Sequence, residues 1–141
     1  MQENIQSIEI AVQSIQDEFS LFDDWIQRYE YIVELGESLT GLPEDKKIDQ
    51  NKVKGCQSQV WFVPSKKDQR LYFEADSDAM IVRGLISLLL RVYSGRTPQE
   101  IMNTPANFFD AIDLGSHLSG NRANGLASMV QHIRSFARLS E

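Results

Sequence analysis

The most reactive side chain in this sequence is its single cysteine, Cys56, which lies in residues 55–61, the stretch GCQSQVW. A deprotonated thiol is a strong nucleophile, and a cysteine sulfur also carries a second sulfur as a persulfide or joins a mixed disulfide. A glycine and polar residues before the β-prone run VWFV are typical of a loop that enters a strand. We therefore expect the sulfur at the tip of a loop.

Two interpretations of Cys56 stand on the residues alone. A lone cysteine is most often a small buried apolar residue. Its neighbours favour a reactive thiol, because Gly55 permits backbone conformations closed to other residues and Lys52 and Lys54 place positive charge nearby. The three polar residues 57–59 are also poorly suited to filling a core. A structural and a reactive role therefore both remain open.

The chain has 141 residues and is expected to form a single domain over residues 1–141, large enough to need no disulfide or metal for stability. One cysteine permits no internal disulfide, which suits a reducing compartment. The first residues lack the basic start and apolar segment of a secretory signal. We expect a cytoplasmic protein that does not insert into a membrane.

Charge is distributed unevenly along the chain. The net charge of −6 argues against a nucleic-acid partner, since binding to phosphates needs clustered lysine and arginine. Residues 1–50 contain 12 acidic and 3 basic side chains, whereas residues 51–141 carry a net charge of +3. The acidic half is interpreted either as a solvated helix surface or as a docking surface that steers a partner protein.

Apolar side chains recur at helical spacing in several segments. A stripe from Ile5 to Phe19 predicts a helix of about four turns, and a second helix is predicted from Asp23 to Gly36. A third, from about Ala79 to Tyr93, is apolar on nearly all sides but too short and too charged to span a membrane, so it should be the buried central helix. The preceding residues 76–78, DSD, offer capping oxygens for it.

Two further helices are predicted near the C-terminus. Residues 97–100, TPQE, form a capping box with proline at the first helical position. The last helix carries a stripe from Leu126 to Ala137 and has Ser119 or Asn121 near its start.

The middle third changes to an extended pattern. Val53 begins one extended segment, residues 60–63 form a β-branched and aromatic run, and residues 71–73 follow a polar turn, so about three antiparallel strands are expected. Pro64 cannot donate a ladder hydrogen bond and should mark a strand end, an edge or a bulge. The order of elements predicts an α+β domain. The loop that carries Cys56, called the thiol loop below, should lie between its first two strands.

Several of these stretches resemble one known family. They are KGCQSQVW at residues 54–61, DSDA at 76–79, IVRGL at 81–85, TPQEI at 97–101, HLS at 117–119, Arg122 and GL at 125–126. In this order they look like the SufE family of sulfur-acceptor proteins, and the similarity runs from about Asp24 to Ala137.

The resemblance implies a role in iron–sulfur cluster assembly. Members of the family accept sulfane sulfur from a SufS-like cysteine desulfurase, which uses PLP, and they stimulate that enzyme and pass the sulfur to a scaffold protein. By position, Cys56 would be the acceptor, and the fold would be the one shared with IscU-type scaffolds. The chain itself would bind no metal or cofactor, and it would be a transfer partner and activator rather than a stand-alone enzyme.

The resemblance also places Arg122 and Asp78 near the thiol loop. Arg122 would favour the thiolate electrostatically, or it would only donate hydrogen bonds to the loop backbone. Asp78 would tether the loop shut, or it would only cap its helix.

Other kinds of site are also compatible with the residue types. Cys56 with His117 would form the nucleophile and base of a small thiol hydrolase, while His132 is expected on the last helix. A metal-binding scaffold is a further alternative, although one cysteine and two distant histidines make a poor ligand set.

Overall fold

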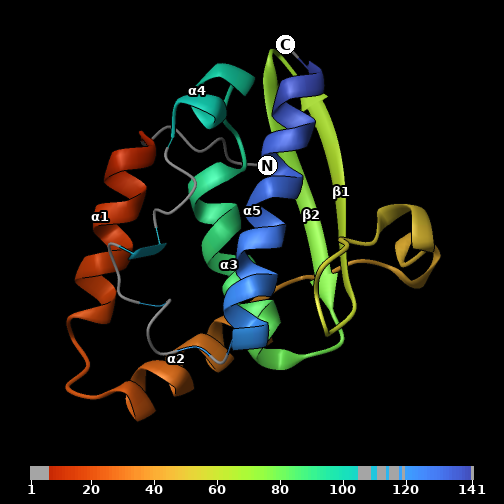
Figure 1. Cartoon of the computed structure of the whole chain (residues 1–141). Helices are drawn as coiled ribbons and strands as arrows, with labels where there is room; N and C mark the ends of the chain where they lie inside the picture. The colour runs from red at the N-terminus through yellow and green to blue at the C-terminus, as the bar shows by residue number, and fades with distance from the viewer. Residues whose placement is uncertain (1–6, 105–108, 111–113, 115–117, 119, 141) are drawn as a thin grey trace.

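The computed structural model describes residues 7–104, 109–110, 114, 118 and 120–140. Their order of elements confirms the predicted α+β class (Figure 1). The elements are α1 (Ile8–Phe19), α2 (Trp25–Ser38), the short 3₁₀ helices η1 (Glu44–Lys46) and η2 (Asp49–Asn51), β1 (Val60–Lys67), β2 (Arg70–Ser77), α3 (Met80–Tyr93), α4 (Pro98–Asn103) and α5 (Gly120–Ser140).

The sheet is an antiparallel hairpin of two strands, paired in register from Val60 opposite Ser77 to Lys67 opposite Arg70. Asp68 and Gln69 both have positive φ angles, of 52° and 70°, which suits a two-residue turn whose twist matches that of the strands. Pro64 lies inside β1 opposite Phe73. Because both strands of such a hairpin are edge strands, the expectation that Pro64 marks an edge is confirmed.

The expectation of about three strands is wrong, because the described part of the chain contains two. The segment at Val53 pairs with β1 through one isolated bridge, between Lys52 and Trp61, and through a hydrogen bond of 2.8 Å from the Val53 N–H to the Val60 carbonyl. Gly55 then adopts a φ of +91° and turns the chain away before a ladder forms. The thiol loop therefore connects a single bridge to β1.

Helix α3 is the centre of the core, as its apolar sequence predicts. Most of its side chains are buried, including the fully buried Ile86, Leu89 and Tyr93. Figure 1 shows α1 on one side of α3, and α5 and the hairpin on the other. Ring contacts of Phe62 with His132 and of Phe73 with Phe136 fix α5 against the hairpin.

The predictions for the helix N-termini differ in their outcome. The capping box at Thr97 and Glu100 is confirmed, and Asp24 caps α2 by accepting a hydrogen bond from the Gln27 N–H. By contrast, α3 has Ala79 at its N-cap and no side-chain cap, so the prediction that residues 76–78 supply its capping oxygens is wrong. The carboxylates of Asp76 and Asp78 bind elsewhere.

Helix α5 buries the predicted stripe, which consists of Leu126, Met129, Val130, Ile133 and Ala137. It begins at Gly120, and the proposed start at Ser119 lies outside the described residues, as does Ile5 of the first stripe. Among the helices that the structure describes, none combines the length and the apolar character needed to cross a membrane.

The contact between α2 and α3 is close enough to require glycine. A Cβ added to Gly84 would lie 2.0 Å from the Ile32 carbonyl oxygen, whereas one added to Gly120 would meet nothing within 4 Å. We predict that Gly84→Ala forces the helices apart and lowers the free energy of unfolding by about 1–3 kcal/mol or more. Gly120→Ala should change it by less than about 1 kcal/mol.

Urea unfolding followed by circular dichroism measures both variants. Equal stability of Gly84→Ala and wild type would contradict the packing described for α2 and α3.

Candidate functional site

The thiol loop is held against the N-terminal part of α5. Gly55 has a φ of +91°, and a Cβ added there would lie 2.5 Å from Ser128 Oγ. The left-handed backbone therefore favours glycine at this position, and a Cβ there would also displace the Ser128 hydroxyl. Cys56 follows directly, so the Gly55 contact determines how the cysteine meets α5.

The sulfur of Cys56 points inward rather than into solvent. The thiol donates a weak hydrogen bond to the Gly125 carbonyl oxygen, with the sulfur and oxygen atoms 3.6 Å apart, and the side chain is half-buried. The residues predict a loop, but not that its sulfur lies against a helix. Gly125 was missed as a functional residue because its carbonyl is 69 positions away in the sequence.

Beside the sulfur is a cavity of about 220 Å³. Its polar side comes from Gln57 and Ser58 of the loop and from Asn121 and Arg122 at the start of α5. Its apolar wall consists of Val60, Val82, Leu85, Leu126 and Met129. The space is several times the roughly 30 Å³ that one water molecule occupies in the liquid, so an additional sulfur atom fits beside Cys56.

Burial raises the pKa of the Cys56 thiol above its ordinary value. The cause is desolvation, because the apolar wall of the cavity disfavours the charged thiolate relative to the neutral thiol. Since the thiolate is the nucleophile, this burial lowers the reactive fraction of Cys56 at a given pH.

Asp78 binds the other end of the thiol loop. Its Oδ1 accepts a hydrogen bond of 3.0 Å from the Gln59 N–H, and its own backbone N–H donates to the Gln59 carbonyl at 3.3 Å. Both backbone groups of Gln59 are thus held by one residue at the β2–α3 corner. This geometry corresponds to a tether rather than to a helix cap.

The structure brings Cys56 and Arg122 to the same cavity, and Asp78 to the end of the loop that carries the cysteine. Arg122 is exposed and lies in the first turn of α5. His117 lies outside the described residues, so the Cys56–His117 pair stays a prediction.

His132 is on α5, as predicted, but it does not line the cavity. Its ring packs against Phe62 and Phe136, its Nε2 is buried with no hydrogen-bond partner among the residues that the structure describes, and burial lowers its pKa. Within the described residues, no three His, Cys, Asp or Glu side chains gather into a group able to hold a metal ion.

Comparison with known proteins identifies relatives along nearly the whole chain. Residues 13–137 match the model of SufE, described as an Fe-S metabolism associated domain. An uncharacterized SufE-like protein of Rhizobium meliloti is 44% identical over 132 residues, which is 90% of this chain and 94% of that protein. Another, from Rhizobium etli, is 44% identical over 134 residues, which is 92% of this chain and 90% of that protein.

A solved structure has the same fold. It is the solution structure of a hypothetical protein from Thermus thermophilus, with a TM-score of 0.75 and 15% identity, and the match covers 92% of this chain and 95% of that one.

The raised thiol pKa predicts a measurable pH dependence of alkylation. In the folded protein, the rate of reaction with iodoacetamide should reach half its maximum at a pH above the ordinary cysteine value of about 8.5, because burial disfavours the thiolate. The same chain unfolded in urea is the control and should show the ordinary midpoint. A folded midpoint equal to or below that of the unfolded chain would contradict the burial described for Cys56.

Proposed function

The chain belongs to the SufE family, whose domain is associated with iron–sulfur metabolism, and we propose that it accepts sulfane sulfur on Cys56. In this proposal the donor is the persulfide of a SufS-like, PLP-dependent cysteine desulfurase, which the chain stimulates by removing its sulfur. The recipient is a scaffold protein for iron–sulfur clusters. The exchange takes place in the cytoplasm, and the chain contributes a thiol but no cofactor or metal of its own.

The observation that carries the proposal is the position of Cys56. It is the only cysteine of the chain, it lies on a loop, and its sulfur borders a cavity with space for another atom. A sulfur carrier needs these properties, because a persulfide is easily reduced or oxidised when it is exposed to solvent.

The transfer is a thiol–disulfide type of exchange. Cys56 first loses its proton, and its thiolate attacks the outer sulfur of the desulfurase persulfide. A new S–S bond forms at Cys56 while the S–S bond of the donor breaks, and the desulfurase cysteine leaves as a thiolate. No external oxidant or reductant is consumed, since the sulfane sulfur only changes its partner.

The closed loop is a resting state in this mechanism. The thiol is protonated and faces Gly125, so the loop has to leave α5 before the sulfur reaches a partner. Release from the apolar wall also removes the cause of the raised pKa, so one movement exposes and activates the thiol. After transfer, closure shelters the persulfide in the cavity.

Arg122 and Asp78 have different roles in this cycle. Arg122 lies on the polar side of the cavity, where its positive charge would stabilise a thiolate or persulfide anion. Asp78 holds the backbone of Gln59 and so keeps the loop closed between transfers. The alternative of a thiol hydrolase receives no support from the described contacts of Cys56, whose thiol donates to a carbonyl rather than to an imidazole.

A desulfurase assay tests the proposal. Wild type should increase the rate of alanine production by a SufS-like desulfurase supplied with cysteine, and Cys56→Ala should give no increase, because it removes the accepting sulfur. Circular dichroism should show an unchanged fold for the variant, with a free energy of unfolding within about 1–2 kcal/mol of wild type. Stimulation that persists in Cys56→Ala would refute the proposed role of the thiol.

A further inference from the structure

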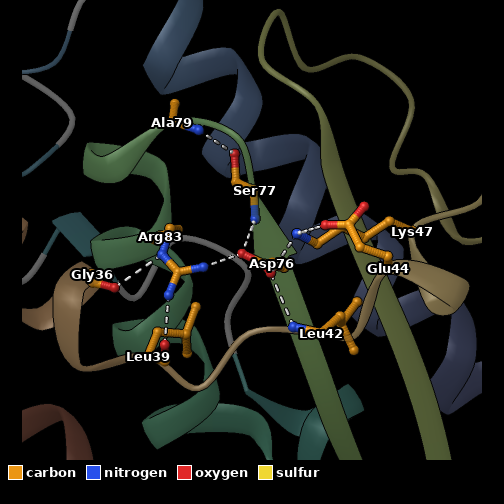
Figure 2. A network of polar contacts seen from close by, with 9 residues as sticks. All are labelled: Gly36, Leu39, Leu42, Glu44, Lys47, Asp76, Ser77, Ala79 and Arg83. Atoms are coloured by element: carbon orange, nitrogen blue, oxygen red, sulfur yellow. Dashed lines mark hydrogen bonds and ion pairs between the residues drawn. The ribbon is translucent and has the colours of Figure 1, made fainter.

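Asp76 is a buried carboxylate at the end of β2, with partners on three separate segments (Figure 2). It accepts hydrogen bonds from the Leu42 N–H at 3.0 Å and from the Ser77 N–H at 2.8 Å. Its oxygens also form ion pairs with Arg83 and, at 3.3 Å, with Lys47. The carboxylate is therefore saturated with donors although it is only 3% exposed.

These donors determine its charge. Burial alone would raise the pKa of Asp76, but the backbone N–H groups of Leu42 and Ser77, together with Lys47 and Arg83, lower it below its ordinary value. Asp76 is therefore ionised at neutral pH. Neutralising it would leave two partly buried cations without their shared counter-ion, which is costly in such a site.

Arg83 extends the contact to the end of α2. Besides Asp76, it donates to the carbonyl oxygens of Gly36, at 3.0 Å, and Leu39 (Figure 2). The Gly36 carbonyl lies in the last turn of α2, where it also accepts a hydrogen bond from the Leu39 N–H at 3.3 Å, and Leu39 is the C-cap residue of that helix. Arg83 and Asp76 thus attach the β2–α3 corner to the packed α2–α3 pair.

Lys47 extends the contact to β1. Its ammonium group lies 5.7 Å from the centre of the Trp61 ring, and Trp61 is the residue directly opposite Asp76 in the hairpin. Lys47 also pairs with Glu44 at 3.3 Å. Lys47, which precedes the thiol loop, therefore contacts Trp61, which follows it.

The corner fixed in this way is the one that holds the thiol loop. Asp78 is two residues from Asp76, and it binds both backbone groups of Gln59. Asp76 is therefore connected to the loop by two routes. One runs along the chain to Asp78, and the other runs through Lys47 to Trp61, two residues after Gln59. The four residues that donate to Asp76 lie outside the lining of the Cys56 cavity.

We infer that Asp76 is a positioning residue for sulfur transfer, which holds the β2–α3 corner so that Asp78 keeps the thiol loop closed on α5. Asp76 does not touch the sulfur and acts through Arg83, Lys47 and Asp78. That Asp76 holds the loop closed does not depend on which protein donates the sulfur. That this matters for sulfur transfer rests on the proposed function.

The test compares variants of the network with a matched ion pair elsewhere. Asp76→Asn removes the charge at nearly constant shape, and Lys47→Met removes one arm at a partly exposed position, in case Asp76→Asn fails to fold. The control is Glu18→Gln, which breaks the ion pair of another carboxylate with an arginine of α3, Arg91. Glu18 and Arg91 do not line the thiol cavity.

The first measurement is the rate of Cys56 alkylation at one pH under native conditions, with thermal unfolding as the measure of stability. Asp76→Asn and Lys47→Met should react about three- to tenfold faster than wild type, as expected for losing one or two hydrogen bonds that hold the loop closed. Glu18→Gln should react at the wild-type rate despite its own loss of stability. Network variants that react no faster than Glu18→Gln at equal stability would overturn the inference.

A second comparison asks whether Asp76 acts through Asp78. Asp78→Ala alone should also increase the alkylation rate, and adding Asp76→Asn to it should have little further effect, because both changes release the same tether. Effects that multiply fully in the double variant would show that Asp76 acts by another route and would overturn this part of the inference.

The last measurement links loop position to sulfur transfer. In the assay with a SufS-like desulfurase, the concentration of this protein that gives half-maximal stimulation should be lower for Asp76→Asn or Lys47→Met than for wild type. The factor should equal the increase in alkylation rate, because a loop that opens more often costs less free energy to bind. The rate at saturation should not change. An unchanged half-saturating concentration would overturn the role in transfer. If wild type fails to stimulate the desulfurase, the proposed function is refuted. The alkylation rates then still test whether Asp76 holds the loop closed.

Discussion

The contact of the Cys56 thiol with the Gly125 carbonyl is the interaction on which the rest of the site depends. A sulfur carrier has to protect its cargo while idle and expose it to two successive partners. A half-buried thiol with a raised pKa meets the first requirement, because burial limits both its contact with solvent and its ionisation. The weakness of a single sulfur–oxygen contact meets the second, since little free energy is needed to break it.

The remaining structure determines where that weak contact can form. Gly55 brings the loop against Ser128, and Asp78 holds Gln59, so the backbone is fixed on both sides of the cysteine. The corner that contains Asp78 is in turn fastened through Asp76 and Arg83 to the end of α2. A short series of polar contacts thus connects the packed helices α2 and α3 to the loop that carries Cys56.

Local patterns in the sequence predict the helices well, and long-range contacts escape prediction. The stripe of α5 and the capping box at Thr97 involve residues three or four positions apart, which interact wherever a helix forms. Asp78 precedes a helix and so resembles a cap, yet its partner Gln59 is 19 residues away. The apolar character of Val53 predicts a third strand, whereas Gly55 two residues later ends the pairing. The cysteine loop is identifiable from sequence, but the wall that buries its sulfur comes from β1, α3 and α5, which only the fold brings together.

The most direct test of the central claim is the intact mass of the protein after incubation with a PLP-dependent cysteine desulfurase and free cysteine. Wild type should gain one sulfur atom, about 32 Da, which a reducing thiol removes, and Cys56→Ala should gain nothing. A gain of the same mass in Cys56→Ala, or no gain in wild type with a desulfurase that is itself loaded with persulfide, would contradict the assignment of Cys56 as the sulfur acceptor.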